Sequence, residues 1–153
     1  MKTPATPLAS PSGFVTGGGP VLEVAAGLVF RHSQLLITQR RPGDHMGGLW
    51  EFPGGKRRPE ETFEQCLERE LFEELGVRVW VGELMAAITH AYPEKTVALR
   101  FFRCTWRAGE PRPIECQALA WVGPADLTRY QFPPADAQLL ADLASKPELW
   151  RIA

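Results

Sequence analysis

The stretch that decides the fold is GKRRPEETFEQCLERELFEELGV, residues 55–77. Its apolar residues recur at every fourth position, as on one face of a helix: Phe63, Leu67, Leu71 and Leu75. Thr62 is a suitable N-cap, and Gly76 stands where a left-handed C-cap glycine is expected. We therefore predict a helix over Glu61 to Leu75 that directly follows a Gly-Gly turn.

The polar face of this predicted helix is rich in carboxylates. Glu70, Glu73 and Glu74 lie at i, i+3 and i+4, so a helix places them on one face, and Glu61 lies at the helix entrance. Seven glutamates fall between residues 60 and 74. A charged helix face is most often simply solvated, and glutamate is a good helix former. Like charges at this spacing nevertheless destabilise a helix, so the cluster is better explained if a divalent cation neutralises it.

The type of ligand indicates which cation this is. Carboxylate oxygens favour hard cations, and magnesium commonly bridges a few carboxylates to the phosphates of a substrate. We therefore predict Mg²⁺ as the cofactor, with Mn²⁺ as a substitute. Basic residues that can bind phosphates locally cluster at Arg40, Arg41, Lys56, Arg57 and Arg58.

The same residues resemble the Nudix box, the signature of a family of hydrolases that act on phosphoric anhydrides. That signature is Gly, five residues, Glu, seven residues, and then Arg-Glu-apolar-any-Glu-Glu-any-Gly-apolar. Here Gly55 and Glu61 fill the first two fixed positions, and RELFEELGV, residues 69–77, fills the rest. Every fixed position matches, so by resemblance the chain is identified as a member of the Nudix family.

The resemblance implies roles for the residues of the box. It implies a metal site formed by Gly55, Glu61, Glu70, Glu73, Glu74 and the more distal Glu115. Arg69 would orient a glutamate by a charge-assisted hydrogen bond, or it is an ordinary surface arginine. Gly54 and Gly55 would let the backbone approach the phosphates, or they form only a tight turn. A glutamate of the box, or Glu115, would act as the general base; the alternative for Glu115 is a loop carboxylate.

The resemblance extends over roughly Val21 to Leu143 and is closest to MutT-type enzymes and CTP pyrophosphohydrolases. The run GDHMGGLWEFPGGK, residues 43–56, resembles the MutT lead-in to the box. By this resemblance Arg40 binds near the base and Lys56 near the phosphates. His45 and Met46 are interpreted as loop packing rather than as catalytic residues.

The segment FPPAD, Phe132 to Asp136, resembles the MutT segment that recognises the base. MutT has asparagine where this chain has Asp136, whereas the CTP pyrophosphohydrolases have aspartate. Asparagine donates and accepts hydrogen bonds, but an ionised aspartate only accepts them. Asp136 therefore suits a base edge with N–H donors, such as cytosine N4 or an oxidised guanine. Its alternative role is to cap the last helix.

The rest of the chain predicts a mixed sheet with helices. Strands are expected over 22–31 and 34–39, joined by a hairpin turn, over 49–52, and over 77–91, 96–106 and 118–122. A last helix is expected over 135–143. This pattern predicts an α+β fold, an α/β/α sandwich with a mixed sheet between helices, as in the Nudix fold. Residues 21–153 would form this one domain, behind a flexible tail, 1–20, rich in Pro, Gly, Ser and Thr.

Composition narrows the possible partners. The net charge of −1 gives no reason to expect long nucleic acid as a partner, and no apolar run is long enough to span a membrane. The three cysteines form no CxxC pair and are expected to be reduced thiols. We therefore expect a cytoplasmic monomer or homodimer that acts on a small-molecule nucleoside triphosphate.

Taken with the resemblance, these features predict a pyrophosphohydrolase that releases a nucleoside monophosphate and pyrophosphate. The leading substrate is 8-oxo-dGTP, which would make the chain a sanitiser of the nucleotide pool. The nearest alternative is CTP, dCTP or 5-methyl-dCTP. Hydrolysis of ADP-ribose or a dinucleoside polyphosphate has weak support from Pro93. A non-catalytic module that binds oxidised guanine is less consistent with the intact glutamates.

Overall fold

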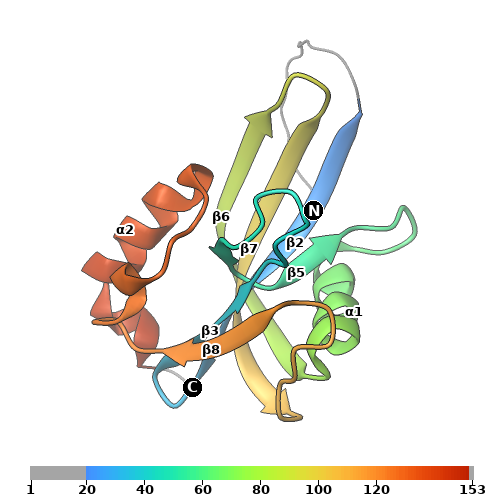
Figure 1. The fold of residues 1–153 in the computed structure, drawn as a ribbon. Coiled ribbons are helices and arrows are strands. Elements are labelled where there is room, and N and C mark those ends of the chain that lie inside the picture. The colour runs from blue at the N-terminus through green and yellow to red at the C-terminus, as the bar shows by residue number, and fades with distance from the viewer. Residues whose placement is uncertain (1–19, 152–153) are drawn as a thin grey trace.

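The computed structural model of the chain describes residues 20–151, and Figure 1 shows their arrangement. The predicted tail, 1–20, lies outside the described residues except for Pro20. Within the described part, no helix combines the length and the apolar character needed to cross a membrane.

A seven-stranded sheet forms the centre of the domain. Its strands are β2 (Val21–Arg31), β3 (Gln34–Gln39), β4 (Trp50–Glu51), β5 (Gly54–Lys56), β6 (Arg78–Ala91), β7 (Thr96–Ala108) and β8 (Ala118–Val122). Five strands follow the order β4-β3-β2-β7-β6, while β5 pairs with β2 and β8 pairs with β3. The β2–β7 pair is parallel and the other pairs are antiparallel, so the predicted mixed sheet is confirmed.

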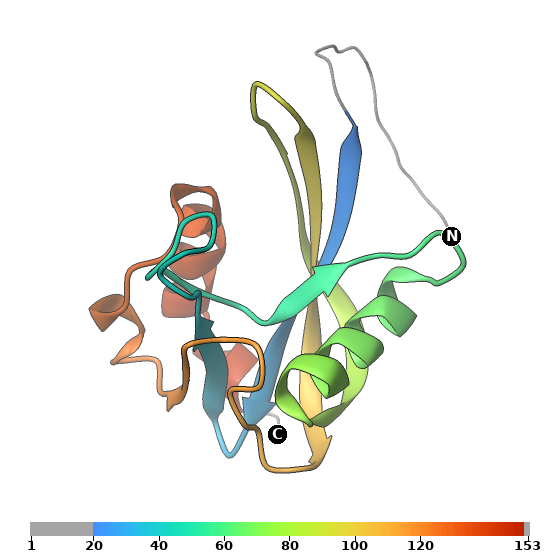
Figure 2. The same ribbon diagram turned by 45° about the vertical axis from the view of Figure 1, so that its right-hand side comes forward.

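Two α-helices, α1 (Phe63–Leu75) and α2 (Ala137–Ser145), cover opposite faces of this sheet, as Figure 2 shows. Three short 3-10 turns accompany them: η2 (Leu127–Arg129), η3 (Pro134–Asp136) and η4 (Pro147–Trp150). Successive residues of a strand point to opposite faces, and β2 therefore serves both layers. Ala25 and Val29 belong to the core under α1, whereas Leu28 and Phe30 belong to the core under α2.

Helix α1 forms where its pattern predicts. All four apolar residues of the stripe are buried: Phe63, Leu67, Leu71 and Leu75. Thr62 caps the helix, accepting a hydrogen bond from the Gln65 N–H while the Gln65 side chain accepts one from the Thr62 N–H. Gly76 ends the helix in the left-handed conformation, with φ of 72°. The helix begins at Phe63 and not at Glu61 because Thr62, the cap, is itself extended.

Strand β5 was not predicted, because Gly54 and Gly55 were interpreted as part of a turn. In the structure β5 pairs with Val24 to Ala26 of β2. A Cβ on Gly54 would lie 1.9 Å from the carbonyl oxygen of Ala25. Glycine is therefore required here by the close approach of two strands, not by a turn.

The remaining elements follow the predicted pattern with small differences. The hairpin turn between β2 and β3 contains His32 and Ser33, both at positive φ. The last helix was predicted over 135–143, but η3 precedes it and α2 runs from Ala137 to Ser145. The three cysteines are free, as expected: Cys66, Cys104 and Cys116.

The close approach at β5 leads to a test. Gly54→Ala should lower the free energy of unfolding by about 1–3 kcal/mol, the usual cost of overpacking, because β5 must move away from β2. Gly43→Ala is the matched control, since a Cβ there would meet nothing within 4 Å. Urea unfolding of both variants measures the difference. Equal stabilities for the two variants would contradict the required close approach.

Candidate active site

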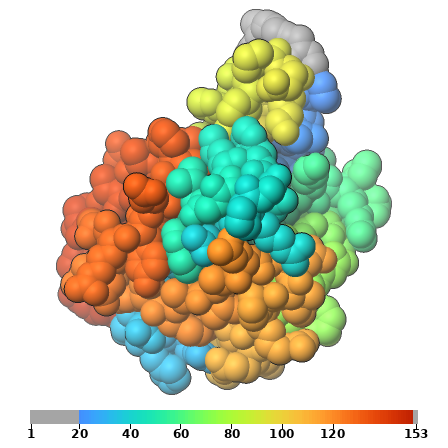
Figure 3. Space-filling model, viewed as in Figure 1, coloured from blue at the N-terminus to red at the C-terminus, as the bar shows by residue number. Residues whose placement is uncertain are grey.

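A cavity of about 450 Å³ opens between β5, α1 and the segment that leads into α2. Its floor is the face of the sheet that carries Val24, Ala26, Val97, Leu99 and Phe101. In Figure 3 the loop that follows β3 lies between the β6–β7 hairpin and the C-terminal segment. His45 and Met46 of this loop line the cavity, and the His45 ring packs edge-on against Tyr92.

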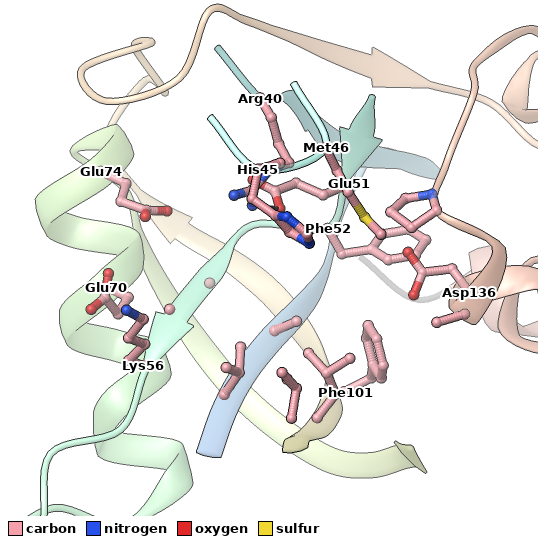
Figure 4. Close-up of a pocket in the computed structure, with 18 of the residues that line it drawn as sticks. Arg40, His45, Met46, Glu51, Phe52, Lys56, Glu70, Glu74, Phe101 and Asp136 are labelled. Atoms are coloured by element: carbon pink, nitrogen blue, oxygen red, sulfur yellow. Dashed lines mark hydrogen bonds and ion pairs between the residues drawn. The ribbon is translucent and has the colours of Figure 1, made fainter. Parts of the chain in front are cut away.

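The cavity has two chemically different ends, which Figure 4 shows. Glu70 and Glu74 of α1 lie at one end together with Lys56 of β5. Asp136 lies at the other end, beside the ring of Phe52. Three of the predicted metal-site residues, Gly55, Glu70 and Glu74, and the predicted phosphate-binding Lys56 therefore face the same space as Asp136.

Arg69 organises the acidic end. Its Nη2 donates to Glu61 Oε1 at 2.6 Å and its Nε donates to Glu61 Oε2 at 3.0 Å. Its Nη1 donates to Glu70 Oε2 at 2.9 Å and to Glu73 Oε1 at 3.2 Å. Nη2 also donates to the Lys56 carbonyl at 3.1 Å. Arg69 thus ties the loop before the helix to the glutamates on it, and its side chain is only 17% exposed.

Because only some of the glutamates contact Arg69, their pKa values differ. Hydrogen bonds from Arg69 lower the pKa of Glu61 to about 2. Glu74 has no such partner, and burial, with the charge of Glu70 second, raises its pKa to about 8. Burial also raises the pKa of Glu70, although Arg69 opposes the shift. Of the two α1 carboxylates that face the cavity, Glu70 therefore has Arg69 as a cationic partner, whereas Glu74 has no hydrogen-bonded cation.

Only some of the predicted metal ligands lie close together in the structure. No three carboxylate, thiol or imidazole groups of residues 20–151 stand close enough to hold a metal as they are placed. Glu73 is half-exposed and paired with Arg69. The exposed Glu115 lines a second cavity of about 210 Å³, which it shares with Glu74 and Glu51.

Two observations nevertheless fit a divalent cation at the helix. The donors that face the cavity are carboxylate oxygens, the ligands that hard cations prefer. Gly55 brings its backbone so near the helix that a Cβ would lie 2.2 Å from the carboxyl carbon of Glu70. Only glycine at this position leaves the Glu70 carboxylate where it is.

Asp136 is buried at the other end, with 6% of its surface exposed. It occupies the N-cap position of α2, but its side chain makes no capping hydrogen bond. Burial, with the charge of Glu51 second, raises the pKa of Asp136 to about 6. Phe132, also predicted to bind substrate, packs against Phe52 with ring centroids 5.0 Å apart. Phe52 lines the cavity beside Asp136, and Phe132 supports it.

Glu51 is a site residue that the sequence interpretation missed. Its carboxylate accepts a hydrogen bond from Arg40 Nη1 at 2.9 Å and faces both cavities. Arg40 also donates to the His45 carbonyl at 2.6 Å, so its guanidinium group already has protein partners. The available signal was the position of Glu51 itself, one charged residue between Trp50 and Phe52 just before the Gly-Gly strand.

The fold and the acidic helix together define a hydrolase of phosphoric anhydride bonds. A family model described as the NUDIX domain matches residues 25–142. The chain belongs to the Nudix family.

Known members of this family are similar over most of the chain. A CTP pyrophosphohydrolase of Escherichia coli K12 is 37% identical over 120 residues, which cover 78% of this chain and 89% of that protein. An 8-oxo-dGTP diphosphatase of Haemophilus influenzae is 38% identical over 127 residues, covering 82% and 93%. A solved MutT structure, from work on Aliivibrio salmonicida and Vibrio cholerae, aligns with a TM-score of 0.69 and 31% identity over 82% of this chain and 97% of that one. Nudix hydrolases generally use divalent metal ions.

The buried Asp136 leads to a stability prediction. Its folded-state pKa of about 6 lies above the ordinary value of 3.8, so ionisation costs stability as the pH rises through this window. Asp136→Asn cannot ionise, and it should be more stable than the wild type at pH 7–8 by up to about 3 kcal/mol, at about 1.4 kcal/mol per pKa unit. The gain should vanish below about pH 4, where the aspartate is protonated in both states.

Urea unfolding between pH 4 and pH 8 measures this difference. Asp142→Asn on the same helix is the matched control, because Asp142 hydrogen-bonds to Gln138 near the surface. A stability difference for Asp136→Asn that does not change with pH would contradict the raised pKa.

Proposed function

We propose that the chain hydrolyses a nucleoside triphosphate to a monophosphate and pyrophosphate, with 8-oxo-dGTP as the leading substrate. One observation carries this proposal: a single cavity joins the glutamates of the Nudix helix to a buried, unpaired carboxyl group at its far end. A triphosphate suits the first end and a nucleobase suits the second. The substrate is then a free nucleotide of the cytoplasmic pool.

The acidic end would hold Mg²⁺, with Mn²⁺ as a substitute, through Glu70, Glu73 and Glu74, with Glu115 and Gly55 nearby. When bound, the cation supplies positive charge to the phosphates and lowers the pKa of a water molecule. Lys56 faces the same space and adds positive charge for the phosphates. Arg69 binds both Glu61, in the loop before α1, and Glu70, on α1. It would therefore keep this loop positioned against the helix during the reaction.

The attack of water on phosphorus needs a proton acceptor. Glu74 is suited to this role because its burial disfavours the charged form, which makes the carboxylate a stronger base. It also borders the second cavity, where Glu115 lies. Glu115, the alternative general base, therefore faces the same second cavity as Glu74.

The next point is which nucleobase the substrate carries. The similar E. coli protein acts on CTP and the H. influenzae protein on 8-oxo-dGTP, by their names. Asp136 accepts hydrogen bonds from a donor edge when it is ionised, and both cytosine and oxidised guanine offer N–H donors. Cytosine nucleotides, namely CTP, dCTP and 5-methyl-dCTP, are therefore the second candidate.

A nucleotide panel tests the proposal. Purified protein is given 8-oxo-dGTP, dGTP, CTP, dCTP, 5-methyl-dCTP, ADP-ribose and a dinucleoside polyphosphate, and the products are resolved by ³¹P NMR. We expect a monophosphate and pyrophosphate, the highest kcat/KM for 8-oxo-dGTP, and no turnover in EDTA until Mg²⁺ or Mn²⁺ is restored. Release of single phosphates, or preference for ADP-ribose, would overturn the triphosphate assignment.

Glu74 should be needed for turnover but not for folding. We expect Glu74→Gln to lower kcat by about 100-fold or more, the usual effect of losing a general base. Its melting temperature should be equal to or above that of the wild type, because glutamine removes a carboxyl group whose ionisation is disfavoured by burial and by the charge of Glu70. Glu68→Gln, at an exposed position of the same helix, is the control and should keep full activity. A Glu74→Gln enzyme with wild-type kcat would remove Glu74 from the site.

A further inference from the structure

The loop between β3 and β4, residues 40–49, forms part of the cavity wall. His45 and Met46, at the tip of this loop, line the cavity, and Figure 4 shows them close to Glu51. The His45 ring also packs edge-on against Tyr92, in the turn between β6 and β7, with ring centroids 5.8 Å apart. The position of the loop tip therefore sets the shape of one side of the cavity.

The backbone at this tip is in a conformation that needs support. Met46 has a φ of 55°, in the left-handed region that a residue with a side chain seldom adopts. A residue in such a conformation persists only where neighbouring groups hold it. Relaxation of Met46 to negative φ would rotate the peptide group that joins it to His45. Both side chains would then move relative to the cavity.

Arg40 holds this same peptide group. Its Nε donates to the His45 carbonyl oxygen at 2.6 Å, and this oxygen belongs to the peptide that joins His45 to Met46. Among the described residues, 20–151, no other side chain hydrogen-bonds to residues 44–46. The backbone of Arg40 meanwhile closes the base of the loop, because its N–H donates to the Leu49 carbonyl at 2.9 Å. Arg40 thus fixes the loop at both its base and its tip.

Glu51 fixes the direction of Arg40. Its Oε1 accepts a hydrogen bond from Arg40 Nη1 at 2.9 Å, so the guanidinium group is bonded through two of its nitrogens to two acceptors. Since that group is planar, two such bonds set its orientation. The two side chains are 31% and 33% exposed, and an ion pair this open adds little to stability. Its effect is to orient the guanidinium group that holds the loop tip.

We propose that Arg40 and Glu51 are positioning residues for the nucleotide site, acting through the peptide between His45 and Met46 and not by touching the substrate. They place the loop tip before a nucleotide enters, so that binding does not include the cost of ordering the loop. The inference rests on the proposed function, which supplies the nucleotide. It departs from the role near the base that the resemblance implies for Arg40.

Hydrogen exchange of the full chain without nucleotide tests the positioning directly. Mass spectrometry follows peptides that cover residues 41–49. In Arg40→Ala and in Glu51→Ala we expect these peptides to exchange about tenfold faster than in the wild type, because the loop opens more often. Glu51→Gln should stay close to the wild type, since its side-chain carbonyl still accepts a hydrogen bond from Arg40. Arg129→Ala, at a side chain that is 78% exposed, is the control and should leave this exchange unchanged. Wild-type exchange in Arg40→Ala would overturn the proposal.

Steady-state kinetics separates positioning from direct contact with the nucleotide. With 8-oxo-dGTP as substrate, Glu51→Ala should raise KM by about tenfold, as expected if about one molecule in ten has the loop in place. Its kcat should stay within about twofold of the wild type, because the nucleotide restores the loop once it is bound. If Arg40 bound the nucleotide directly, Glu51 would compete for the guanidinium group, and Glu51→Ala would lower KM. A lower or unchanged KM therefore contradicts the positioning role.

Arg40→Lys is the second variant, should an alanine variant fail to fold. A lysine ammonium group lacks the planar fork that joins the two acceptors, so exchange and KM should change in the same directions as in Arg40→Ala. Wild-type values of both in Arg40→Lys would also overturn the proposal. Absence of hydrolysis of every triphosphate by the wild type would refute the proposed function instead, and the exchange measurement would still decide whether Arg40 positions the loop.

Discussion

The Arg69 guanidinium group distributes its N–H donors among three carboxylates and one backbone carbonyl. Without this buried positive charge, Glu61, Glu70 and Glu73 would repel one another across the loop and the first turns of α1. Each charge-assisted bond is stronger than a neutral one, and the guanidinium plane fixes their directions. The Glu61 carboxylate of the loop before α1 can therefore lie close to the glutamates of the helix, and the phosphate end of the cavity keeps its shape.

Close packing of the β5 backbone also helps to position the glutamates that Arg69 binds. Because Gly55 has no side chain, β5 lies directly against the Glu70 carboxylate. Because Gly54 has none either, the same strand also lies against Ala25 of the central β2 strand. Strand β5 thus joins the Glu70 carboxylate of the acidic wall to the central strand of the sheet through two close contacts.

Helix α1 could be predicted almost completely from sequence, since its apolar period, its N-cap threonine and its C-cap glycine are all local signals. The acidic face followed from the same period. Strand β5 could not be predicted, because its pairing with Val24 to Ala26 is distant in sequence and its glycines also suit a turn. The role of Glu51 was hidden for a similar reason: β4 has two residues, too few for a pattern, and its contact with Arg40 depends on how β3 and β4 pair. The burial of Asp136 depends on where the last helix docks.

The carboxyl groups at the two ends of the cavity have different environments, so the two ends suit different parts of a ligand. Glu61 has a pKa of about 2, Asp136 of about 6 and Glu74 of about 8, set by Arg69, by burial beside Glu51 and by burial beside Glu70 respectively. At the α1 end the Glu74 carboxylate has no hydrogen-bonded cationic partner, and it gains from a cation that brings a polyanion with it. At the Asp136 end the carboxyl group makes no capping hydrogen bond, and Phe52, Phe101, Pro133 and Ala135 contribute apolar wall. A triphosphate placed there would face this buried carboxyl group in a medium that screens charge poorly. Under the proposed function a nucleotide therefore enters in one orientation only, with its phosphates on the Nudix helix and its base at Asp136.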